Sequence, residues 1–210
     1  MPCRSALLLA LIASVPAAEL AVRDVRLGIA TRPADFDFTV TTPLVSGSGS
    51  DAFDGGLSVE GGLRWSFART GDAFGLIAGA DLAMDGQGYE DGDGLATMWA
   101  KAAGGFGWAV NDQLTLMAEG LIGYGLSDLS LPATSSAAAY TADGTATAYE
   151  ARVTGTWQFT RDFNAGLMVG WLVADHDLSG DDSELTIEQS GWYAGVVFAW
   201  RINDLPLPLE

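Results

Sequence analysis

The chain is poor in cysteine, histidine and basic residues. It has one Cys and one His, and only 10 Lys or Arg against 27 Asp or Glu, for a net charge of −17. So acidic a chain repels nucleic-acid phosphates, which excludes a nucleic-acid partner. Beyond the N-terminal segment, no apolar run reaches the roughly 18 residues that a transmembrane helix needs.

The N-terminal segment has the pattern of a secretory signal peptide. Arg4 precedes an apolar run over 6–15, and small residues follow around Pro16. This predicts a signal peptide over 1–18, cleaved after Ala17 or Ala18. Cleavage removes Cys3, so the mature chain has no thiol for a disulfide or a thiolate-bound metal. No cofactor-binding motif follows.

Apolar residues alternate with glycine, small or polar residues through the remaining chain, which is typical of half-buried β-strands. Turns of three or four residues alternate with long polar connectors. This rhythm predicts an all-β fold, an eight-stranded antiparallel up-and-down transmembrane β-barrel over 19–202 with a short C-terminal tail at 203–210. The eight predicted strands are 19–31, 56–69, 74–85, 95–110, 114–127, 145–160, 164–175 and 186–202.

The first strand is ambiguous, because the segment around Phe36, Phe38 and Val40 also alternates. This segment either continues the strand past a bulge at Pro33 or is itself the first strand. The connectors after it, including 41–55, 85–94, 128–144 and 175–185, are expected to be long polar loops.

Aromatic residues on the apolar face form two groups, one near the short turns and the other near the long connectors. Aliphatic and small residues lie between them, as in a membrane barrel with an aromatic girdle at each interface. The predicted interface aromatics are Trp65, Phe67, Phe74, Phe106, Trp108, Tyr124, Tyr149, Trp157, Phe159, Trp171, Trp192, Phe198 and Trp200.

The opposite face is rich in glycine, which suits the crowded interior of a narrow barrel better than a solvated exterior. The alternative is a soluble calyx-type barrel whose apolar face is turned inward around an apolar ligand. A calyx does not require aromatic residues to gather at its two ends, and its glycine-rich exterior would be poorly solvated. The pattern therefore favours the membrane barrel.

Five acids and five bases have the inward parity, which predicts mutual pairing because unpaired buried charges are costly. A charge-paired, largely plugged lumen is favoured over a narrow porin-like channel, since a selective pore tends to carry a surplus of one sign. Glu60 with Arg64 and Glu150 with Arg152 are candidate pairs. The predicted lumen charges are Asp24, Arg26, Glu60, Arg64, Asp81, Lys101, Glu119, Glu150, Arg152 and Arg201.

His176 is the only candidate for a catalytic base. Ser179, Asp175 and Asp177 are its neighbours in sequence, but three neighbours on one loop rarely converge as a catalytic set. We expect no enzyme activity and a solvated histidine at a loop edge. Clustered carboxylates at 88–94 and 179–185 lack the spacing of a calcium loop, which leaves weak divalent-cation binding at acidic loops as an expectation.

These features together resemble the small eight-stranded outer-membrane barrels, of the opacity-protein and OmpA-transmembrane-domain kind. The resemblance is architectural and covers nearly all of 19–202. It implies insertion by the outer-membrane assembly machinery into the outer membrane of a Gram-negative-type cell, in contact with membrane lipid and lipopolysaccharide. An envelope-structural or surface-interaction role is preferred. The alternatives are a porin-like channel, a lipid-modifying enzyme and the calyx.

Overall fold

The fold is an all-β barrel, seen in a computed structural model that describes residues 21–67, 73–88, 94–131, 139–180 and 182–202. Its strands are β1 Ala21–Thr31, β2 Asp35–Thr41, β3 Ser46–Ala52, β4 Gly55–Phe67, β5 Phe74–Gly88, β6 Gly94–Ala109, β7 Leu114–Leu131, β8 Tyr140–Gln158, β9 Phe163–Gly180 and β10 Ser183–Arg201. The predicted signal peptide and C-terminal tail lie outside the described residues. Among the residues described, no helix is long and apolar enough to cross a membrane.

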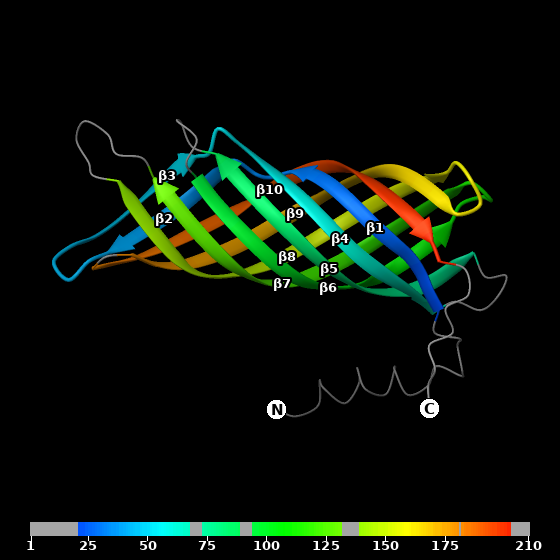
Figure 1. The fold of residues 1–210 in the computed structure, drawn as a ribbon, viewed down its shortest axis with the longest axis horizontal. Helices are drawn as coiled ribbons and strands as arrows, with labels where there is room; N and C mark the ends of the chain where they lie inside the picture. The colour runs from blue at the N-terminus through cyan, green and yellow to red at the C-terminus, as the bar shows by residue number, and fades with distance from the viewer. Residues whose placement is uncertain (1–20, 68–72, 89–93, 132–138, 181, 203–210) are drawn as a thin grey trace, which may run out of the picture.

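The strands pair in the order β1-β4-β5-β6-β7-β8-β9-β10, and β10 pairs in turn with β1. All these pairings are antiparallel. The β1–β10 ladder joins the two edges of the sheet, as the encircling strands in Figure 1 show. The predicted eight-stranded up-and-down architecture is confirmed.

β1 and β2 follow one another along the same edge of β10, so the two strands together occupy one strand position in the barrel. β10 pairs with β1 up to Ala30↔Gly195 and then with β2 from Phe36↔Gln189, with no change of register between them. The ladder is interrupted at Arg32-Pro33-Ala34, where proline has no N–H to donate. The segment around Phe36 therefore continues the first strand past Pro33, which was one of the two readings left open by the sequence.

The strands are longer than the sequence pattern predicted. β7, β8, β9 and β10 have 18 or 19 residues each, about twice the 9–11 that cross a bilayer. The expected long loop at 175–185 is instead a continuation of β9 and β10 to a tight turn, with Asp182 at a positive φ of 56°. The expected loop at 41–55 holds β3, which pairs with β2. The expectation of long loops was wrong at both places, because polar residues also alternate and extend the strand ladders at this end of the barrel.

The end with the tall hairpins, β2–β3 among them, is at the left of Figure 1, and the short turns are at the right. We call the left end the rim and the right end the base. Ser46–Ala52 (β3) is fully exposed, and Figure 1 shows the β2–β3 hairpin projecting beyond neighbouring β5.

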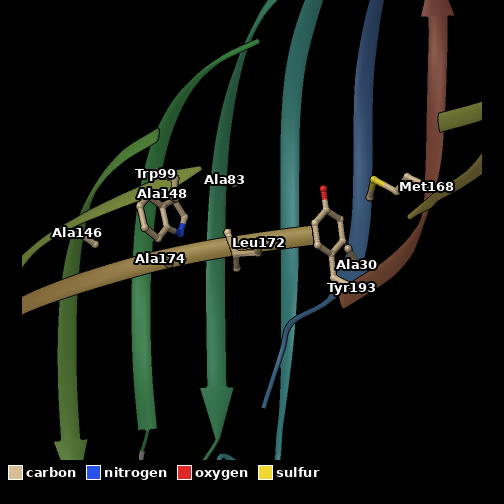
Figure 2. Packing of buried hydrophobic residues seen from close by; sticks show 9 residues of the cluster. All are labelled: Ala30, Ala83, Trp99, Ala146, Ala148, Met168, Leu172, Ala174 and Tyr193. Atoms are coloured by element: carbon tan, nitrogen blue, oxygen red, sulfur yellow. The ribbon is translucent and has the colours of Figure 1, made fainter. Parts of the chain in front are cut away.

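Buried side chains point into the interior of the barrel at several levels. Trp99, Leu172 and Tyr193 point into the lumen from three strands, together with small residues such as Ala146 and Ala174 (Figure 2). Nearer the rim a second apolar cluster crosses the lumen. It consists of Phe53, Leu95, Leu129, Ala142, Leu178, Leu185 and Ile187, flanked by Phe36, Phe38, Val40, Leu131 and Tyr140. We call this cluster the rim-side apolar layer.

Candidate functional site

A network of buried ion pairs crosses the lumen at the level of the barrel's middle. Arg64 is fully buried and binds Asp81 through both terminal nitrogens, at 2.6 and 2.8 Å, while its Nε donates to Glu119. Arg26 donates to the same Glu119 at 3.3 Å. Arg152 donates to Glu60, and also to Asp81 and Glu119 at 3.3 and 3.4 Å. Each carboxylate at the centre thus accepts from more than one guanidinium, the arrangement that compensates the desolvation of buried charge.

A second part of the network lies closer to the rim. Arg32 donates to Asp85 from its Nη2 at 3.0 Å and to Glu150 from its Nη1 at 3.4 Å. Lys101 also donates to Glu150, and the Tyr193 hydroxyl donates to it at 3.2 Å. The Arg32 guanidinium stands 5.3 Å from the centre of the Tyr193 ring, a cation–π distance. Together the two parts contain five bases and six acids, counting Asp24, which lies 3.6 Å from Arg26, and no ion pair between described residues joins one part to the other.

Inward glycines make room for these large side chains. A Cβ on Gly62 would stand 1.7 Å from the Asp81 carboxylate, and one on Gly79 would stand 2.6 Å from the Arg64 side chain. Glycine therefore has a steric function on this face, since each of these positions stands directly opposite a charged residue on the paired strand, Gly62 opposite Asp81 and Gly79 opposite Arg64.

Nine of the ten lumen charges that the sequence singled out lie in this network: Asp24, Arg26, Glu60, Arg64, Asp81, Lys101, Glu119, Glu150 and Arg152. Arg201 lies apart from the centre, half-buried at the base, where its backbone N–H bonds Asp162.

The candidate pairs that the sequence suggested do not form. Arg64 pairs with Asp81 and Glu119, and Arg152 pairs with Glu60. The sequence does not give the register between strands, so the suggested pairs joined residues of one strand. The barrel instead brings together side chains from strands that are far apart in sequence.

Sequence reasoning missed Arg32, Asp85 and Tyr193. Asp85 has the same parity as Asp81, four residues further along the same predicted strand, so applying the parity to the last residue of 74–85 would have found it. Arg32 has the parity of Arg26, and only the assumption that the strand ends at Thr31 hid it. Pro33, at the interruption, accepts side-chain bonds from Gln87 at 2.8 Å and from Gln189.

His176 is buried, not solvated, which corrects the sequence expectation. It is 2% exposed and points into the lumen below the rim-side apolar layer, whereas Asp175, Asp177 and Ser179 have the outward parity on β9. Its Nδ1 is 2.9 Å from the hydroxyl of Ser127, and its ring meets Trp99 edge-on at 5.8 Å. Burial lowers the pKa of His176 to about 4, and the nearby charges of Asp85 and Asp177 oppose that shift only in part.

The outer surface of the barrel changes character along its height. Large apolar side chains cover the middle, including Leu82 at 71% and Leu167 at 69% exposure. The predicted interface aromatics all have the outward parity. Trp65, Phe67 and Phe198 are half-buried, and the exposed ones are Phe74, Phe106, Trp108, Tyr124, Tyr149, Trp157, Phe159, Trp171, Trp192 and Trp200.

Ring contacts join these aromatics at both levels. Trp171 and Trp192 meet edge-on at 5.4 Å on the rim side, and Phe74 stacks on Phe106 at 5.4 Å near the base. Phe163 joins the basal group through Phe198 and Trp200, at 6.4 and 5.5 Å. The sequence pattern had placed Phe163 in a turn.

Above the rim-side aromatics the outer face is acidic. Its carboxylates are Asp35, Asp37, Asp128, Asp143, Asp175, Asp177, Glu184 and Glu188. Three of them stand opposite one another on neighbouring strands, in the row Asp175↔Glu188↔Asp37. Of the Lys and Arg side chains that the structure describes, five are buried in the lumen, and Arg161 and Arg201 lie at the base. The described part of this outer face therefore has no base to balance its acids.

The described residues contain no group of three or more His, Cys, Asp or Glu arranged to hold a metal ion. The carboxylates at Glu90, Asp91 and Asp93, which the sequence offered for weak divalent binding, lie outside the described residues.

The chain shares its fold with solved outer-membrane proteins. The outer membrane protein OprG from Pseudomonas aeruginosa aligns over 89% of this chain and 98% of its own, at 11% identity and a TM-score of 0.51. Neisserial surface protein A (NspA) covers 83% and 95% at 10% identity, with a TM-score of 0.44. Ail, the attachment invasion locus protein of Yersinia pestis, covers 87% and 100% at 14% identity, with a TM-score of 0.36. The alignment with OprG confirms the resemblance at the level of the fold.

No protein-family model matches the sequence, and no curated protein does.

Proposed function

We propose that this chain is an outer-membrane β-barrel of a Gram-negative-type cell, with a closed lumen and an envelope-structural or surface-interaction role. It acts through the acidic rim and does not pass solutes. The observation that carries this proposal is the charge network below the rim-side apolar layer, because the two together fill the interior of the barrel.

The belt of exposed apolar side chains supports the membrane location. Side chains as large as Met84, Leu126 and Leu167 are each more than 60% exposed and lie on different sides of the barrel. Water-soluble monomers rarely expose apolar area on this scale, whereas lipid solvates it favourably. The shared fold with OprG agrees with insertion by the outer-membrane assembly machinery and with contact with lipopolysaccharide.

The packing of the lumen supports closure. Leu178 and Arg64 are among the largest fully buried side chains, one in the apolar layer and one in the charge network. An eight-stranded barrel is only wide enough for its own side chains to fill. A solute would have to displace the apolar layer and break ion pairs that hold buried charge.

Conductance across a planar bilayer tests the closed lumen against the narrow channel. We expect the refolded full-length protein to show no steady openings. Steady openings whose ion selectivity changes in Glu119→Gln would overturn the closed lumen and establish the channel, because Glu119 is at the centre of the network.

A lipid-modifying activity through His176 is disfavoured by its surroundings. His176 and its partner Ser127 are each 2% exposed, so a lipid has no path to either of them. Lipid A acylation in cells carrying His176→Ala should equal that with the native protein. A difference would restore the enzyme hypothesis.

A further inference from the structure

The tall β2–β3 hairpin ends in an unpaired strand. β3 is the last strand of the sheet on that side, bonded to β2 and to no other strand described. β5 ends at Gly88, where its backbone oxygen accepts from Asp54. Among the described residues, no strand pairs with the second edge of β3.

The backbone groups at this edge can be assigned from the ladder. Hydrogen-bonded pairs alternate along an antiparallel ladder. The pairs at the two ends of the hairpin, Phe53 to Ala34 and Thr42 to Val45, are hydrogen-bonded at 3.0 and 2.9 Å. Counting inward in steps of two leaves the backbone groups of Ser46, Ser48 and Ser50 directed to the open edge. Ala52, the next in that series, has its N–H bonded by the side chain of Asp51 at 2.8 Å.

β3 has few of the features that protect an edge strand in natural sheets, and its one charged residue is Asp51. Protective devices include lysines, prolines and bulges along the edge strand. Between Ser46 and Ala52 there are only Ser, Gly, Asp and Ala. The glycines are required by packing on the other side, since a Cβ on Gly49 would stand 2.9 Å from the ring of Phe38. The side chains of Ser46, Ser48 and Ser50 on the outer face are small, so little side-chain bulk stands next to the edge.

The acidic row leads directly to this edge. Ser50 is opposite Asp37 on β2, which is opposite Glu188 on β10, and Asp175 continues the row on β9. Neighbouring strands lie about 4.8 Å apart, so a long side chain on an added strand can reach across serine to Asp37. Like charges opposite one another on neighbouring strands destabilise a sheet, and a cation beside them relieves the repulsion.

We infer that β3 is a docking edge for an extended, basic polypeptide segment of another protein, which adds a strand to the barrel wall above the membrane. Backbone bonds to Ser46, Ser48 and Ser50 supply the attachment, and lysine or arginine at alternate positions faces the acidic row. This inference rests on the proposed surface-interaction role and names the site and the partner chemistry for it.

The probe is a fluorescent, acetylated octapeptide of alternating Lys and Thr, added to the full-length barrel in lipid nanodiscs. We expect anisotropy to report saturable binding, and hydrogen exchange at 46–50 to slow when the peptide is bound. Ser48→Pro removes one edge N–H without touching a bond to β2, and it should weaken binding about tenfold or more. Ser48→Ala, which keeps the N–H, should bind as the native protein does.

The charge requirement has its own pair of variants. Asp37→Asn should weaken binding and lower its salt dependence, while Asp112→Asn, at an exposed turn of the base, should change neither. An alternating Glu and Thr peptide should not bind.

Three results would overturn the docking edge. Equal binding of the backbone N-methylated Lys-Thr peptide, or of Ser48→Pro, would show attraction by charge alone. Exchange at 46–50 that is already slow without peptide, together with dimers of the barrel, would show that a second copy fills the edge. Absence of binding would remove the site, and the closed lumen would still stand on its conductance test.

Discussion

Carboxylates occupy two opposite environments in this barrel. Inside, Asp81, Glu119 and Glu150 are buried, and each is bonded to at least two basic side chains. Outside, toward the rim, Asp37, Asp175 and Glu188 lie in a row with no base on the described part of that face. The inner acids are held by buried ion pairs, whereas the outer acids have no base beside them among the described residues.

The largest effect is expected from breaking the inner network at its centre. Arg64→Met leaves Asp81 and Glu119 with fewer partners in a buried site, which should lower the free energy of unfolding by about 3–5 kcal/mol. Urea titration of the barrel in lipid vesicles, followed by the loss of heat-modifiable migration on gels, measures it. Asp112→Asn at an exposed turn is the control and should change stability by less than about 0.5 kcal/mol. Equal effects in the two variants would contradict a structural network.

An intermediate effect is expected from acid, through His176. Its pKa in the folded barrel is about 4, below the ordinary 6.5, so the unfolded chain binds the proton more tightly. The lowered pKa therefore corresponds to a contribution of up to roughly 3 kcal/mol to the free energy of unfolding. This contribution is present above pH 6.5 and is lost as the pH falls from 6.5 to about 4. The measurement is urea unfolding of the native barrel and of His176→Gln across this range. The variant should lose this part of the pH dependence. A pH profile identical to that of the native protein would mean that the histidine is not held neutral by burial.

The smallest effect is expected on the outer row. Glu188→Gln removes the middle charge of three, so it should raise the free energy of unfolding by about 0.2–1 kcal/mol at low salt, and less at high salt. Urea unfolding at two ionic strengths tests this. Destabilisation by the substitution would show that the row is held together by contacts other than charge.

The parity of the strands could be predicted from the sequence, because side chains alternate strictly between lipid and lumen along each strand. This is why nine of the ten lumen charges identified from the pattern lie in the network, and why Trp171 and Trp192 face outward. Register could not be predicted, because it depends on which residues of two strands stand opposite one another. The partners of Arg64 and Arg152 were therefore assigned wrongly.

The rim shows the other limit of the sequence. A segment rich in polar residues, such as 175–185, is predicted to be a loop if both of its faces are assumed to contact water. In the barrel only one face of this hairpin meets water, and His176, Leu178 and Leu185 fill the lumen from the other. Whether this segment forms a loop or a strand depends on what each of its two faces contacts, and the sequence of the segment alone does not contain that information.

The sequence by itself determined the eight-stranded plan, the two faces of each strand and the excess of acid, since composition and a period of two are local properties. Only the tertiary structure decided which charges pair, that Arg32 enters the lumen at a proline break, that His176 is buried, and that β3 pairs with β2 alone among the described strands. These depend on closing the sheet into a barrel, which brings distant strands together and leaves one hairpin taller than its neighbour.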